Sequence, residues 1–216
     1  MTSPFSTSER SESLMDWFQL HSREVIWGGA AVVLLAAGGW FYNRSRELKA
    51  ERAERAYFTA ARAISAGNLP LAESDLKKMV ERYDGTPASM QARLQLAQVM
   101  YDQGKAQEGV DLLKASEDEI SSSDEFGSSV HVVLAAGYEQ LKKYSEAAAQ
   151  YEKAAKAARF DADRQRYMSQ AGQDYLLAGN KAKATEIWTA LGADSKGVVA
   201  GEARVRLGEL TATPQS

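Results

Sequence analysis

Side chains that could act as nucleophiles, general bases or metal ligands are few in this sequence. The chain has 216 residues, with no cysteine and only two histidines, His21 and His131. Thiolate chemistry is therefore excluded, and a histidine-based metal centre would need more imidazole groups than the chain supplies. The acidic run EDE at residues 117–119 lacks the spacing of a calcium-binding loop, so we expect a solvated surface there.

No recognisable catalytic motif organises the remaining polar side chains. The sequence contains no Walker A loop, dinucleotide fingerprint, GxSxG elbow or HExxH zinc motif. His131 lies in HVVLAAGYEQL, at a position that comparable segments fill with Arg93 or Met168, which indicates packing. We therefore expect a non-enzymatic protein with no cofactor, metal ion or small-molecule substrate. A formal net charge of −3 also lacks the basic excess typical of nucleic-acid binding, so no nucleic-acid partner is expected.

The elements that would carry any function begin with an apolar stretch. Residues 25–42, VIWGGAAVVLLAAGGWFY, contain no charged side chain. Eighteen helical residues at ~1.5 Å each span about 27 Å, close to the roughly 30 Å hydrocarbon core of a bilayer. Trp27 at one end and Trp40 and Tyr42 at the other would lie at the two membrane interfaces. We expect a retained single-pass transmembrane helix, with the lipid bilayer and other membrane proteins as its surroundings.

A cleavable signal peptide is the main alternative for this stretch. The first 24 residues carry four acidic side chains instead of a short basic region, which favours the retained anchor. We expect residues 1–24 to form a polar tail with a short interfacial helix in SLMDWFQLHSREV. Within the span, the small residues Gly28, Ala31 and Gly38 either admit a closely packed partner helix or simply face lipid.

The rest of the chain carries an internal repeat. In each unit a small residue is followed after seven residues by a turn residue. A second small residue comes five residues after the turn residue, and a large apolar or aromatic residue comes four residues after that. The four sets are Ala60, Gly67, Ala72 and Leu76; Ala97, Gly104, Gly109 and Leu113; Ala135, Lys142, Ala147 and Tyr151; Gly172, Gly179, Ala184 and Trp188.

This pattern predicts helical hairpins. Small residues let two helices cross closely, and glycine at the turn can adopt the positive φ that ends a helix. The segments YEQLKKYSEAAAQYEKAAKA and YLLAGNKAKATEIWTAL resemble tetratricopeptide repeats, at a longer period of 37 or 38 residues. Lys142 stands where the other units have glycine, so we expect its turn to close differently.

The predicted fold is therefore all-α. One transmembrane helix is followed, in residues 43–210, by a tetratricopeptide-like, right-handed α-solenoid of about four hairpins. GVVAGEARVRLGEL forms a capping helix, and residues 211–216 form a frayed tail. Repeat position suggests that a concave wall presents polar side chains to a protein partner, or that these side chains only keep the wall soluble. These candidate groove residues are Gln98, Tyr101, Glu139, Arg166 and Gln173.

The layout resembles the YfgM-like family. The resemblance is closest in WFQLHSREVIWGG, GGWFYNRSRE and AERAYFTAARAISAG. It implies a cytoplasmic tail, an anchor in the bacterial inner membrane, a periplasmic repeat domain, and an adaptor role near the Sec translocon and periplasmic chaperones. A membrane-anchored scaffold is therefore the expected function. The alternative is a permanent accessory subunit of a large integral-membrane complex, respiratory or photosynthetic.

The distribution of basic residues opposes the sidedness that this resemblance implies. Two basic residues lie within about 20 residues of the span on its N-terminal side, and six lie on its C-terminal side. The positive-inside rule alone would place the repeats in the cytoplasm. Long domains, however, are translocated largely regardless of charge. We therefore favour the periplasmic side on the strength of the resemblance.

Overall fold

The computed structural model describes residues 22–123 and 125–212, which fold into helices joined by turns, without a β-strand among these residues. The all-helical expectation is confirmed for this part of the chain. Most of the predicted interfacial helix, residues 13–25, lies within residues 1–21, and its last four residues form the start of the first described helix; most of the predicted C-terminal tail lies within residues 213–216. Residues 1–21 and 213–216 are outside the described residues.

The first helix, α2, runs without interruption from Ser22 to Ser65 and contains the apolar stretch. By its contacts the chain divides into two units, Met1–Lys49 and Ala50–Ser216, and α2 contributes to both. The boundary between anchor and repeat domain predicted at residue 43 therefore falls inside a continuous helix. In the first unit, the side chains of Val32, Val33, Leu34 and Leu35 are 65–76 % exposed.

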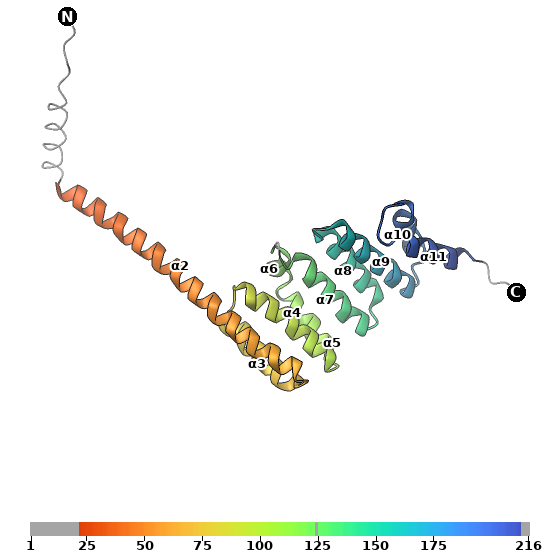
Figure 1. The fold of residues 1–216 in the computed structure, drawn as a ribbon, viewed down its shortest axis with the longest axis horizontal. Helices are drawn as coiled ribbons and strands as arrows, with labels where there is room; N and C mark the ends of the chain where they lie inside the picture. Colours follow the sequence, from red (N-terminus) through yellow and green to blue (C-terminus); the bar gives the residue numbers. More distant parts are fainter. Residues whose placement is uncertain (1–21, 124, 213–216) are drawn as a thin grey trace, which may run out of the picture. The chain divides into compact units, whose positions relative to one another are not determined.

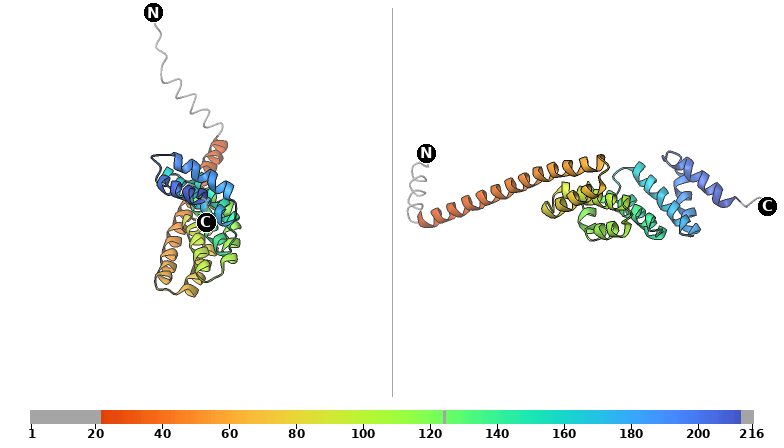
Figure 2. Two further views of the ribbon diagram at one scale, coloured as in Figure 1. Left: turned by 90° about the vertical axis from the view of Figure 1, so that its right-hand side faces the viewer. Right: turned by 90° about the horizontal axis from the view of Figure 1, so that it is seen from below.

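In the second unit, consecutive helices form antiparallel hairpins that follow one another in chain order (Figures 1 and 2). Residues 50–65 of α2 pair with α3, and three further hairpins follow, with the short α6 between the second and third and α11 after the last. The bounds are α3 Leu69–Arg82, α4 Pro87–Asp102, α5 Ala106–Lys114, α6 Glu117–Ser121, α7 Gly127–Gln140, α8 Tyr144–Ala157, α9 Asp161–Leu177, α10 Lys181–Ala193 and α11 Ala200–Thr211.

The four hairpin turns close in the same way. Gly67, Gly104, Lys142 and Gly179 have φ values of 71°, 75°, 57° and 82°. In the first turn, the Gly67 N–H donates to the Ile64 carbonyl and the next N–H donates to the Ala63 carbonyl, both at 2.9 Å. This double hydrogen bond is the Schellman closure of a helix C-terminus.

The expectation that the Lys142 turn closes differently was wrong. Its N–H donates to the Glu139 carbonyl at 2.8 Å, and the Lys143 N–H donates to the Tyr138 carbonyl at 2.8 Å. The physical reason is that these hydrogen bonds and the hairpin packing outweigh the cost of about 1 kcal/mol for a side chain in the left-handed region.

The small residues of the repeat lie where the helices cross. Ala60, Ala97 and Ala135 are fully buried. At Gly109, a Cβ atom would lie 2.5 Å from Cε1 of Tyr101, so the tyrosine ring occupies the space that a side chain would need. Helix packing at this crossing therefore depends on glycine.

The hydrophobic core continues from one hairpin into the next. Helix α4 contributes Leu96 and Val99 to a cluster with α2 and α3, and it contributes Leu94 and Ala97 to the next cluster, with α5 and α7. A third cluster joins α7 to α11 around the buried Trp188. Each hairpin thus buries its apolar surface against a neighbour, as expected for stacked repeats.

Ion pairs connect the same elements. Glu73 of α3 accepts hydrogen bonds from Lys77 at 2.5 Å and from Lys105, which precedes α5, at 2.7 Å. These two lysines hold the pKa of the Glu73 carboxyl down at about 2. Arg93 of α4 pairs with both Asp84 and Glu119, and so links α4 to the loop after α3 and to α6.

Candidate binding surfaces

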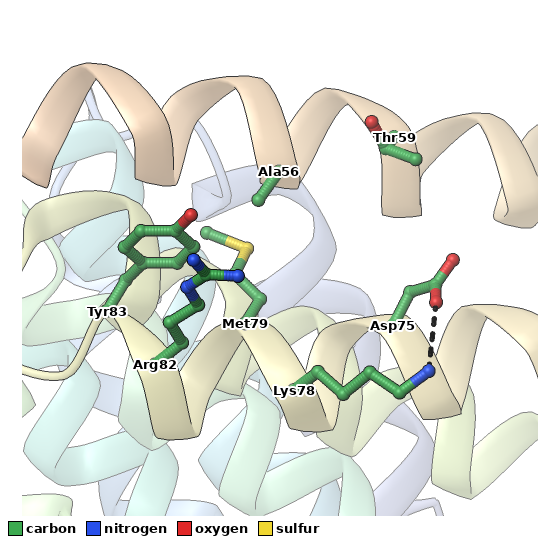
Figure 3. Close-up of a pocket in the computed structure, with 7 residues that line it drawn as sticks. All are labelled: Ala56, Thr59, Asp75, Lys78, Met79, Arg82 and Tyr83. Carbon is green, nitrogen blue, oxygen red and sulfur yellow. Dashed lines mark ion pairs between the residues drawn. The ribbon is translucent and has the colours of Figure 1, made fainter.

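The first hairpin of the repeat domain carries a pocket of about 280 Å³ between α2 and α3. Figure 3 shows Ala56 and Thr59 of α2 facing side chains that rise from α3. The other lining residues come from α3 and from Tyr83, which follows it; those in α3 are Asp75, Lys78, Met79 and Arg82.

The pocket combines an apolar floor with a charged rim. Met79 is only 2 % exposed, and Ala56 is half-buried. Lys78 Nζ lies 3.8 Å from Asp75 Oδ1, so these two charges form an ion pair. The Arg82 guanidinium lies over the Tyr83 ring, 5.7 Å from its centroid (Figure 3). An apolar floor with a few oriented polar groups suits noncovalent recognition.

The five predicted groove residues have different environments. Gln98 and Arg166 are exposed, and Glu139 and Gln173 are half-buried. None of the hydrogen bonds or ion pairs found among the described residues joins two of the five. Tyr101 is only 5 % exposed, because its ring packs against Gly109 and Gly137. Tyr101 is a core residue, and we do not include it in a binding surface.

Glu139 lies beside a buried acid that the sequence analysis missed. Asp174 of α9 is 2 % exposed, and its Oδ2 atom has no hydrogen-bond partner. Burial, followed by the charge and hydrogen bonding of the neighbouring Glu139, raises the pKa of Asp174 to about 7. The sequence held only a weak signal, because the repeat offsets align Asp174 with Val99 and Gly137 but also with the charged Arg62.

His131 and the acidic run also lie closer together than expected. His131 is buried, with Nδ1 2.9 Å from Oε1 of Gln150, and burial lowers its pKa. Glu117, which we expected to be solvated, is half-buried, 3.6 Å from His131 Nδ1 and 2.7 Å from Lys153 Nζ. This network joins α6, α7 and α8. Within the described ranges, no three His, Asp or Glu side chains are grouped as metal ligands would be.

The predicted membrane residues are exposed along α2. Trp27, Trp40 and Tyr42 are 74 %, 69 % and 62 % exposed. Gly28 and Gly38 have open space where a side chain would begin, and Ala31 is exposed. Among the described residues, one helix is long and apolar enough to cross a membrane. A signal sequence near the N-terminus has the same length and composition.

Comparison with known proteins identifies the class as helical-repeat proteins. Residues 15–207 match the tetratricopeptide repeat-like domain family, so the chain belongs to this family. The matched region includes the apolar stretch as well as the repeats. No curated protein matches the sequence.

Solved structures with a similar fold are also repeat proteins. The nearly identical TPR-like repeats of a protein assigned as a kinesin light chain from Podosopora anserina superpose with a TM-score of 0.59. The identity is 18 %, over 74 % of this chain and 85 % of that one. A tetratricopeptide repeat protein from Parabacteroides merdae ATCC 43184 gives a TM-score of 0.58 at 18 % identity, over 74 % of this chain and 60 % of that one. At this identity the similarity shows the fold alone.

Proposed function

We propose that the protein is a membrane-anchored, non-enzymatic scaffold whose repeat domain binds other proteins at the membrane surface. The observation that carries the proposal is the single family match over residues 15–207, which joins an uncharged stretch at 25–42 to the repeats. A repeat array provides an extended surface for protein ligands, and an anchor holds that surface where membrane-associated ligands are concentrated.

The exposure of the apolar stretch supports an anchor. Covering an aliphatic side chain contributes about 1.5–3 kcal/mol, so Val32, Val33, Leu34 and Leu35 together represent on the order of 6–12 kcal/mol. This amount is comparable to the whole stability of a typical domain. A helix with this surface gains most when lipid or another membrane helix surrounds it.

The particular setting that we propose is the bacterial inner membrane, with the repeats on the periplasmic side and near the protein translocon. This part of the proposal rests on the resemblance to the YfgM-like family. The six basic residues after the span favour the opposite sidedness. A reporter fused after Ser216 distinguishes the two, because alkaline phosphatase is active only after export and green fluorescent protein fluoresces only in the cytoplasm.

A permanent subunit of a large membrane complex is the second candidate. The open space beside Gly28 and Gly38 favours it, since a partner helix could approach the backbone closely there. Native gels of the gently solubilised protein, followed by mass spectrometry, separate the two candidates. Co-migration with one complex at fixed stoichiometry indicates a subunit, whereas several substoichiometric partners indicate a scaffold.

Anchoring itself is tested by extraction of membranes with alkaline carbonate. The native chain should stay in the membrane, and mass spectrometry should find residues 25–42 still attached. The double variant Leu34→Lys/Leu35→Lys should be released, because each lysine costs about 2.5–3.5 kcal/mol at the centre of a span. The control Glu47→Lys/Glu51→Lys changes two exposed residues outside the stretch and should be retained. A native chain that begins beyond Tyr42 and is soluble would refute the proposal.

A further inference from the structure

The pocket on the first hairpin includes one residue, Thr59, whose equivalents are buried in every later hairpin. The repeat offsets align Thr59, which is exposed, with Leu96, Leu134 and Ala171, which are 1 %, 0 % and 0 % exposed. Residue types follow the same trend, because a polar threonine stands where the later hairpins have apolar residues. The first hairpin therefore differs from its successors in the surface that it leaves open.

In the later hairpins, this position is covered by the second helix of the preceding hairpin. Leu96 shares a core cluster with Leu76 and Met79 of α3. Leu134 shares one with Val110 and Leu113 of α5. In these two hairpins, the second helix of the preceding hairpin thus covers the position that corresponds to Thr59.

Ala171 follows the same rule, because it shares its cluster with Ala147 and Tyr151 of α8. Helix α3 begins the series, and the repeat domain contains no hairpin before the α2–α3 hairpin among the described residues. The open face of the first hairpin therefore has the shape that an additional helix would complete.

We propose that this pocket receives an acidic amphipathic helix of a partner protein, which places an apolar side chain over Ala56 and Met79 and a carboxylate beside Arg82. The inference rests on the proposed scaffold function and names the first hairpin as a docking site. It differs from the concave wall of the array, because the site lies on the end face where stacking begins.

The charges around the pocket select the acidic partner. Lys78 is already paired with Asp75, at 3.8 Å. Arg82 lies on the Tyr83 ring, and none of the ion pairs found among the described residues includes it. A guanidinium stacked on an aromatic face keeps its N–H edge available for a carboxylate, which it binds with two parallel hydrogen bonds.

The size of the pocket fits a side chain and not a large ligand. Its volume of about 280 Å³ lies just below the range of about 300–1,000 Å³ that is usual for small-molecule sites. A helix supplies such a side chain together with a charged residue one turn away, on the same face. A partner helix with leucine or phenylalanine followed four residues later by glutamate would place an apolar side chain on the pocket floor and a carboxylate beside Arg82.

The test uses the full chain in detergent micelles and two synthetic, side-chain-cross-linked helical peptides labelled with a fluorophore. Both peptides carry the same leucine stripe, flanked by glutamates in one and by lysines in the other. Fluorescence anisotropy measures binding to the native chain and to Arg82→Glu, Thr59→Arg and Lys114→Glu. The last variant reverses an exposed charge on α5 and serves as the matched control. Circular dichroism of each variant establishes that it is folded.

The native chain should bind the acidic peptide about tenfold more tightly than the basic one. Arg82→Glu should reverse this preference, Thr59→Arg should weaken binding of both peptides by obstructing the pocket, and Lys114→Glu should change neither. Equal binding of the two peptides, or acidic-peptide binding that Arg82→Glu leaves unchanged, overturns the proposal.

Two further outcomes are decisive. If the native chain is a dimer by sedimentation and Thr59→Arg makes it monomeric, the occupant is a second copy and the proposal is wrong. If proteins that co-purify with the native chain also co-purify with Thr59→Arg and Arg82→Glu, the docking site is refuted while the scaffold function stands. If no protein co-purifies with the native chain, the scaffold function itself is refuted.

Discussion

Replacement of Asp174 by asparagine should remove a pH-dependent weakness from the repeat domain. Asp174 is buried beside Glu139, with one carboxyl oxygen lacking a hydrogen-bond partner. Its pKa is raised from 3.8 to about 7 in the folded protein. Asparagine keeps nearly the same shape and cannot ionise, so Asp174→Asn isolates the cost of the charge.

The sign follows from proton binding. Between pH 3.8 and about 7, the folded chain keeps a proton on this carboxyl that the unfolded chain has released. The native protein therefore loses stability as the pH rises through this window, and the loss is complete above pH 7. At about 1.4 kcal/mol per pKa unit, the shift corresponds to at most about 4 kcal/mol. Entry of water and small movements reduce this cost, and we expect about 2 kcal/mol.

The assay is urea denaturation of the full chain in micelles, followed by circular dichroism at intervals between pH 4 and pH 8.5. The quantity of interest is the unfolding free energy of Asp174→Asn minus that of the native chain, because titrating groups that do not interact with Asp174 cancel in this difference, which leaves the Asp174–Glu139 pair. It should increase by about 2 kcal/mol from pH 4 to pH 8. Asp102→Asn, at an exposed position on α4, is the control and should show no such increase. A difference that is constant with pH would show that Asp174 is not held in a protonated state by its surroundings.

Three other predictions concern the turns, the crossings and the ion pairs, all measured as unfolding free energies in urea. Lys142→Gly should stabilise the protein by about 0.5–1 kcal/mol because it removes a side chain from a backbone with φ of 57°; a loss of stability would contradict this. Gly109→Ala should destabilise by about 1–3 kcal/mol because its Cβ meets the Tyr101 ring, and a second change, Tyr101→Leu, should recover part of that loss; additive effects would argue against the contact. Glu73→Gln should reduce the unfolding free energy by about 1 kcal/mol at pH 7 after solvent screening, because the ionised Glu73 carboxylate stabilises the folded state above pH 4.5. This reduction should vanish as the pH falls toward 2 and the carboxylate is protonated. A reduction that persists at low pH would exclude the ion pair as its cause.

The repeat pattern predicted the helical hairpins because it depends on local geometry. Small residues at fixed offsets mark the crossings, and Gly67, Gly104 and Gly179 mark turns that need a positive φ. These properties are visible residue by residue. The turn at Lys142 was mispredicted because its conformation is determined by the packed helices on both sides rather than by its own side chain.

The binding residues were less accessible to sequence reasoning. Repeat position suggested that Tyr101 faces a partner, but the absence of side chains at Gly109 and Gly137 lets its ring turn into the core. Asp174 was overlooked because an isolated acid in a helix is usually solvated, and its burial depends on α7 and α8. The exposed face at Thr59 could not be predicted from one hairpin. It is recognised only when the exposure of Thr59 is compared with the burial of the equivalent residues in the other hairpins.

The sharing of clusters between hairpins determines how the array responds to mechanical load. Helix α4 belongs to two clusters, so detaching an end hairpin removes only one side of its neighbour's contacts and leaves the other intact. A pull on the C-terminus would therefore peel the array one hairpin at a time instead of breaking it in a single event. Tension applied at the C-terminus would therefore be absorbed as a series of small, reversible extensions before it reached the hairpin formed by α2 and α3.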